Sequence, residues 1–172
     1  MAGLHTIEGN IAPLFDRLRI ARSVAEPQAL QNLDRAALQE SVRRELTWLF
    51  NVRSPTPAGR FAEVELTAVD YGVPDFTAFS PQSGEDRQRL GKLLVRAVSA
   101  FEPRLKGVEI AVEAVNGAPQ ALLARLEATL VAGPLMVPLT LAIAIHGLGG
   151  ADQVVEVHVL ASFEPPPRPT VV

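Results

Sequence analysis

The sequence contains no cysteine, which excludes disulfide bonds, thiolate catalysis and cysteine-based zinc sites together. Aromatic residues are scarce, with one Trp and one Tyr, so few rings are available to stack on sugars. No strong charge of one sign is present, because the net charge is -3 and acidic and basic residues are interspersed. Nucleic acids and anionic membranes attract strongly basic surfaces, so neither is expected as a partner.

What the chain does have is apolar residues, at 48% of its 172 positions. That length and composition predict one domain with a single hydrophobic core. The opening "MAGLHTIEGN" has neither a basic start nor an apolar run, so it does not read as a secretory signal. With the lack of cysteine, this pattern predicts a cytoplasmic protein.

One uncharged stretch, "TLVAGPLMVPLTLAIAIHGLGGA" at residues 129–151, is long enough to cross a bilayer as a helix. Two features argue against a membrane span. Gly133, Pro134 and Pro138 interrupt the stretch, and its apolar residues recur at every second position: Val137, Leu139, Leu141, Ile143 and Ile145. We therefore predict a turn followed by a buried strand.

The N-terminal half is expected to be helical. Residues 1–33 form an arm in which "LFDRLR" at 14–19 predicts a short helix. Asp34 is a candidate N-cap for a helix that runs to about Phe50, and residues 51–60 form a loop with two prolines. The pattern of "FAEVELTAV" at 61–69 does not decide the secondary structure of this segment. Ser83 starts a second, strongly amphipathic helix that ends near Pro103.

The C-terminal half alternates apolar and polar residues, as strands do. Four strands are expected near residues 108–112, 122–130, 134–145 and 153–163, with turns between them. The fold class is therefore α+β, in which two or three N-terminal helices precede an antiparallel β meander that packs on the main helix. This domain spans residues 34–163, and "EPPPRPTVV" at 164–172 predicts a mobile proline-rich tail.

Signatures of chemistry are few. His5, His146 and His158 are far apart in sequence and lack the short spacings of zinc sites, so no metal is expected. "GLGG" at 147–150 follows a strand but lacks the Gly-Lys-Ser/Thr ending of a phosphate-binding loop, and we interpret it as a hairpin turn. No Gly-x-Ser-x-Gly element occurs.

The carboxylate residues are compatible with one catalytic alternative, a glycoside hydrolase. Glu102, beside an aromatic residue, is the candidate acid, with Asp70 or Asp75 as its partner. However, Arg104 would lower the pKa of Glu102 if the two approach each other, which is the wrong direction for a general acid. We interpret the acid and base on either side of Pro103 as a docking corner rather than a catalytic pair.

Three motifs in order resemble a known family: "ESVRRELTWLFNVR" at 40–53, "VDYGVPDF" at 69–76 and "FEPRL" at 101–105. They are similar to the TssE family of type VI secretion baseplate subunits, within the lysozyme-like baseplate-wedge proteins shared with contractile phage tails. The resemblance covers residues 38 to about 145 and "LFDRL" at 14–18. It departs from the family pattern at "LFNVR" and "DYGVPDF", where "LLNTR" and "NYGLPDL" are more usual.

The resemblance implies a non-enzymatic structural component without a cofactor, nucleic acid, small-molecule substrate or membrane insertion. Its partners would be other wedge subunits and contractile sheath proteins, and a larger complex would recruit it to the inner membrane. Glu102, Pro103 and Arg104 would form the interaction element. The structural motif would comprise Arg53, Tyr71, Gly72, Pro74 and Asp75.

A physical argument supports this role, because the end strands of a meander leave unpaired N–H and C=O groups that another chain can complete. Arg104 suits a bidentate contact with a carboxylate, either within the fold or across an interface. The sequence leaves this choice open, as it does the kind of contractile machine.

Overall fold

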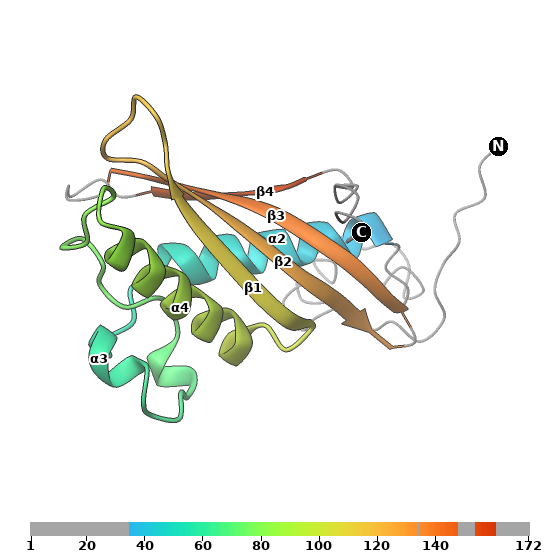
Figure 1. Cartoon of the computed structure of the whole chain (residues 1–172). Helices are drawn as coiled ribbons and strands as arrows, with labels where there is room; N and C mark the ends of the chain where they lie inside the picture. Colours follow the sequence, from blue (N-terminus) through green and yellow to red (C-terminus); the bar gives the residue numbers. More distant parts are fainter. Residues whose placement is uncertain (1–34, 134, 148–153, 161–172) are drawn as a thin grey trace, which may run out of the picture.

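The computed structural model describes residues 35–133, 135–147 and 154–160 (Figure 1). Helices come first and strands follow, which confirms the α+β prediction. The helical elements are α2 (Arg35–Asn51), α3 (Ala58–Phe61), the 3₁₀ helix η2 (Ala68–Asp70) and α4 (Gly84–Phe101). The strands are β1 (Leu105–Ala114), β2 (Leu122–Ala132), β3 (Leu135–His146) and β4 (Val154–Val159).

The four strands form one antiparallel sheet in the order β1-β2-β3-β4, as the predicted meander requires. β2 and β3 pair along their full length, from Leu122 opposite Ile145 to Ala132 opposite Leu135. β4 pairs only with the second half of β3, from Leu141 onward. α4 packs against β1 and α2 against β4, so the helices form a second layer on one face of the sheet (Figure 1).

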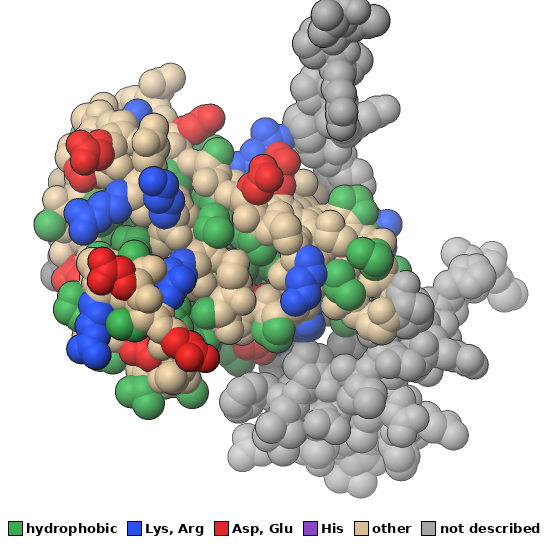
Figure 2. Space-filling model, turned by 60° about the horizontal axis from the view of Figure 1, so that its bottom comes forward, with side chains coloured by type: hydrophobic (Ala, Val, Ile, Leu, Met, Phe, Trp, Pro, Cys, Tyr) green, Lys and Arg blue, Asp and Glu red, His purple; other side chains and the backbone are tan. Residues whose placement is uncertain are grey.

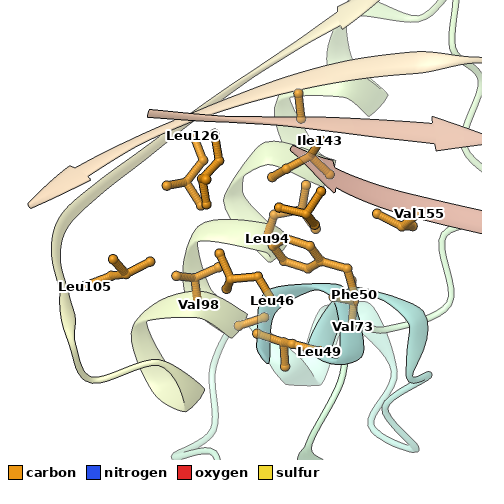
Figure 3. Close-up of a cluster of buried hydrophobic side chains, with 14 of the residues drawn as sticks. Leu46, Leu49, Phe50, Val73, Leu94, Val98, Leu105, Leu126, Ile143 and Val155 are labelled. Atoms are coloured by element: carbon orange, nitrogen blue, oxygen red, sulfur yellow. The ribbon is translucent and has the colours of Figure 1, made fainter. Parts of the chain in front are cut away.

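Strand alternation builds the core between these layers. Leu126, Ile143 and Val155 point from three strands toward Leu46 and Leu94 of the two long helices (Figure 3). Successive side chains in a strand point to opposite faces, so each strand gives one row to this core and one to the outer face. Burial of the inner rows is the main stabilising contribution, at roughly 25 cal/mol for each Å² removed from water.

α4 follows its sequence signals at both ends. The hydroxyl of Ser83 accepts a hydrogen bond from the backbone N–H of Asp86 at 3.2 Å, which makes Ser83 the predicted N-cap. The helix ends at Phe101, because the residue before Pro103 is disfavoured in helical geometry and Glu102 adopts φ -123° and ψ 79°. The chain then turns directly into β1.

Other boundaries add to or depart from the predictions. The open segment at residues 61–69 contains the last residue of α3, a turn and the start of η2, rather than a strand. β4 lies within the expected strand at 153–163, of which residues 153 and 161–163 are outside the described residues. The arm at 1–33, the cap at Asp34, His5 and the tail at 164–172 lie outside the described residues.

The long uncharged stretch is the end of β2 followed by β3, as the period-two pattern predicted. Pro138 lies in the half of β3 that precedes its pairing with β4, where a missing N–H costs less than between two partner strands. Among the described helices, none has the length and apolar character needed to cross a membrane.

A close backbone approach joins the loop after α2 to the segment before α4. The N–H of Ser54 donates to the carbonyl of Val73, and the N–H of Val73 donates to the carbonyl of Val52, both at 2.9 Å. Gly72 has φ +116°, and a Cβ at this position would lie 2.4 Å from the Val52 carbonyl oxygen. Only glycine fits here, because both the dihedral angle and the space exclude a side chain.

We therefore predict that Gly72→Ala lowers the free energy of unfolding by roughly 3 kcal/mol, since it combines left-handed strain with a clash against backbone. Gly117→Ala is the matched control. Gly117 has φ +80° with nothing within 4 Å of its added Cβ, so only the strain of about 1 kcal/mol is expected. Urea denaturation of both variants measures the difference, and equal losses would contradict the close approach.

Candidate functional site

The corner between α4 and β1 contains a bidentate ion pair. The Arg104 guanidinium donates from Nε to Glu102 Oε1 at 2.7 Å and from Nη2 to Glu102 Oε2 at 2.6 Å. Its Nη1 donates to the Ser41 hydroxyl oxygen on α2 at 3.0 Å. Pro103 separates the two charged residues and keeps them on one side of the turn. One arginine thus connects the end of α4, the start of β1 and α2.

The ion pair of Glu102 and Arg104 is largely buried. The side chain of Glu102 is 5% exposed and that of Arg104 is 18% exposed, whereas Pro103 is exposed. A buried carboxylate is costly unless it is paired, and here both of its oxygens accept from Arg104. The structure therefore places most of the Arg104 contact within the fold, and Pro103 is the solvent-facing part of the corner.

Tyr71 connects this corner to the second motif. Its ring meets that of Phe101 edge to face, with ring centroids 5.3 Å apart and an interplanar angle of 61°. Burial raises the pKa of the Tyr71 hydroxyl above its ordinary value, and the negative charges of Glu45 and Glu102 raise it further. Tyr71 is therefore held neutral beside two carboxylates.

The rest of the predicted structural motif lies at the backbone junction. Arg53 Nη1 and Asp75 Oδ2 form an ion pair at 3.0 Å with both side chains about half exposed. Arg53 also forms an isolated parallel bridge with Val73, while Gly72 and Pro74 are buried. The three sequence motifs thus meet in space, the first through Ser41 and Arg53, the second through Tyr71 and the third through the ion-paired corner.

The two candidate catalytic partners of Glu102 are engaged in local turns. Asp70 accepts hydrogen bonds from the side chains of Thr56 and Thr67 and from the Thr67 N–H, and these lower its pKa. The backbone and side chain of Thr77 bind Asp75 and lower its pKa likewise. Both carboxylates are stabilised in the ionised form as turn caps.

His146 and His158 lie in the described part of the chain, and His5 does not. His146 ends β3 with its side chain exposed, and His158 Nε2 lies 3.5 Å from Glu156 Oε2 on the outer face of β4. Over residues 35–133, 135–147 and 154–160, no cluster of three His, Cys, Asp or Glu residues could hold a metal ion.

Charged side chains of both signs cover the side that carries α3 and α4, which lies at the bottom of Figure 1 and faces the viewer in Figure 2. Lys and Arg lie among Asp and Glu on this face, and no broad field of one sign forms there (Figure 2). This agrees with the interspersed charges of the sequence.

Sequence reasoning missed two polar residues of α2. Ser41 receives the Arg104 hydrogen bond, although it lies 63 residues earlier in the chain. The Asn51 side chain exchanges two hydrogen bonds with the backbone of Val155 in β4. Both belong to "ESVRRELTWLFN", but only tertiary packing identifies their partners.

The fold and the corner define a small α+β protein. Its two long helices pack on a four-stranded antiparallel meander, and an ion-paired turn joins α4 to β1. Residues 36–135 match the family model of baseplate wedge protein gp25. Because the match covers more than half of the chain, the protein belongs to this family, and the predicted resemblance is confirmed. No curated protein and no solved structure gives a significant match.

We predict that Arg104→Met lowers the free energy of unfolding by about 3–5 kcal/mol, because it leaves Glu102 buried without its cation. The double variant Glu102→Leu, Arg104→Met should recover most of this loss. Arg53→Met is the matched control and should cost less than about 1 kcal/mol, since its pair with Asp75 is exposed. Chemical denaturation measures all three, and a double variant as unstable as the single one would contradict the ion-pair explanation.

The raised pKa of Tyr71 predicts a loss of stability in alkali. The stabilising contribution is fully present below the unfolded-state pKa near 10 and is lost as the pH rises through the higher pKa of the folded state. Because the chain has one tyrosine, absorbance at the phenolate wavelength reports Tyr71 alone. The phenolate should appear at higher pH in the native than in the urea-unfolded protein, and Tyr71→Phe should remove this pH-dependent loss. Identical titrations would contradict the buried environment.

Proposed function

We propose that this chain is a non-enzymatic structural subunit of the baseplate in a contractile injection machine of the type VI secretion kind. In this role it docks on other wedge subunits and provides a template on which the contractile sheath begins to assemble by strand addition. Membership of the gp25 baseplate wedge family supports the baseplate role. The cytoplasmic location and the recruitment to the inner membrane stay predictions.

The observation that carries the strand-addition part is the open sheet. The described strands form a meander of order β1-β2-β3-β4, so the sheet ends in two edges and does not close into a barrel. An edge strand presents backbone N–H and C=O groups at a regular spacing, and an extended segment of another protein can hydrogen-bond to them. Growth of a sheath by strand exchange would need such a starting surface.

The corner of Glu102, Pro103 and Arg104 is proposed to position the docking surface for wedge subunits. Its ion pair fixes the direction in which β1 leaves α4, and Pro103 is the part that a partner can touch. The charged residues would then act on docking mainly through the shape of the corner.

The glycoside hydrolase alternative has weaker support from the geometry. A general acid must present its carboxyl group to the substrate, but both oxygens of Glu102 are occupied by Arg104 inside the fold. Asp70 accepts hydrogen bonds from Thr67 in its own turn and from Thr56, and Asp75 accepts from Thr77. A muralytic assay of the native chain checks this alternative, and activity that Glu102→Gln abolishes would establish it.

The proposed role is tested by co-expression with the wedge and sheath proteins encoded beside this chain. We expect the full chain to co-purify with both, and electron microscopy should show sheath tubes attached to baseplates only when the chain is present. The control variant is Gly117→Ala, which changes an exposed turn. Sheath assembly at baseplates without the chain, or a folded chain that binds neither protein, would refute the proposal.

A further inference from the structure

The two edges of the sheet differ in how far they are already occupied. At the β4 edge, the Asn51 side chain donates to the Val155 carbonyl at 2.7 Å and accepts from the Val155 N–H at 3.0 Å. Arg43 Nη1 donates to the Val157 carbonyl at 3.4 Å. Side chains of α2 thus satisfy backbone groups that an added strand would need, which is one way in which proteins protect a sheet edge.

The β1 edge has no such cover from the described residues. β1 pairs with β2 regularly from Glu109 to Ala114, after a register shift between Lys106 and Glu109. In an antiparallel pair, every second residue directs its N–H and C=O away from its partner strand. Among the described residues, no side chain or loop hydrogen-bonds to these outward groups of Glu109–Ala114. Within the described part of the chain, this six-residue stretch is therefore available to an added strand.

A groove runs beside this free edge on the side of α4. Its volume is about 1060 Å³. Ile110 and Val112 of β1 and Gly91 and Val95 of α4 form its apolar part, and the charged side chains of Glu65, Arg87, Lys92 and Arg96 line the rest. Gly91 is buried, and a Cβ there would lie 3.1 Å from the Ile110 carbonyl oxygen, so the helix runs close under the strand. Side chains of a strand added beside β1 would enter this groove at every second position, and apolar ones fit the part of it that Val95, Ile110 and Val112 form.

The outer face of the same edge is acidic. Glu109 and Glu113 are exposed there, and Glu127 of β2 lies directly opposite Glu109. Arg125 forms an ion pair with Glu127 at 3.2 Å, which leaves these acids in excess. Like charges directly opposite one another are destabilising, and opposite charges on adjacent strands are favourable. A neighbouring strand with Lys or Arg on this face would offset the repulsion.

We infer that the strand is added at β1, and that the incoming segment carries apolar side chains toward α4 and alternates them with Lys or Arg on the outer face. This inference rests on the proposed function, which supplies the sheath protein as the source of the segment. To the proposed function it adds three details: the edge that receives the strand, the residues Glu109–Ala114 that pair with it, and the sequence pattern of the partner segment. The alternation follows because successive residues of a strand meet two different surfaces, one apolar and one acidic.

A second copy of this chain fits the β1 edge poorly. Two antiparallel β1 strands side by side would bring Glu109 and Glu113 of both copies onto one face. Adjacent acids of this kind repel one another, so the charge pattern favours a basic partner over self-association.

Site-specific crosslinking tests the edge, because the natural chain has no cysteine. Ala111→Cys and Glu156→Cys place a short benzophenone label on exposed outer-face positions of β1 and β4. The purified sheath protein encoded beside this chain is the probe. We expect a crosslink from position 111 and none from position 156, which lies about 19 Å from a strand added at β1 given the usual strand spacing. Mass spectrometry of the crosslinked peptide should show apolar residues alternating with Lys or Arg.

A charge-reversal pair tests the partner chemistry. Glu109→Lys with Glu113→Lys should weaken binding of the same sheath protein by about tenfold, since attraction becomes repulsion at two positions. The change should not harm the fold, because it replaces the opposition of Glu109 and Glu127 by an opposite-charge pair. Glu156→Lys on β4 is the matched control, with binding expected to change less than about twofold.

The outcomes separate this inference from the proposed function. Binding of the sheath protein with a crosslink at position 156, a crosslink between two copies of this chain, or unchanged affinity of the reversal variant would overturn the inference and leave the proposed function standing. A crosslinked segment without alternating basic residues would do the same. If the folded native chain binds no sheath protein at all, the proposed function itself fails.

Discussion

The pairing of Arg104 with Glu102 is the constraint on which the arrangement of the other elements depends. It bridges the last residue before Pro103 and the first residue after it, so the direction from α4 into β1 is fixed at one turn. Through Ser41 the same guanidinium holds α2 against this turn. A buried charge tolerates little displacement of its partner, because separation exposes each ion to an unfavourable environment. The two helices and the first strand are therefore positioned together.

The placement of β1 has consequences for the surface of the protein. The N–H of Val131 donates to the Arg104 carbonyl at 2.8 Å, so the corner also sets where the end of β2 lies. From there the meander extends away from β1, and its last strand reaches α2, where Asn51 and Arg43 bind its backbone. Side chains of the helix layer thus cover one edge of the sheet, while the other edge runs beside a groove and carries exposed acids. Under the proposed function, this asymmetry would direct an added strand to the β1 edge.

A large part of the fold could be predicted from local patterns. Ser83 and Pro103 mark the ends of α4 because capping and proline sterics act within a few residues, and period-two alternation locates β1, β2 and β3. The segment at 61–69 could not be assigned, since its weak alternation ends in a short helix, a turn and η2. Alternation predicted the strand that contains Val155 and Val157, but it does not show that β4 pairs only with the second half of β3.

The sequence by itself determined the α+β class, the order of helices before strands, and the motifs that resemble baseplate wedge proteins. These properties follow from hydrophobic periodicity and from short-range stereochemistry, which need no knowledge of distant contacts. Only the tertiary structure decided that Arg104 binds inside the fold, that Tyr71 meets Phe101, and that side chains of α2 bind the backbone of β4. Each of these depends on residues many positions apart, whose meeting is fixed by packing and burial rather than by their spacing in the chain.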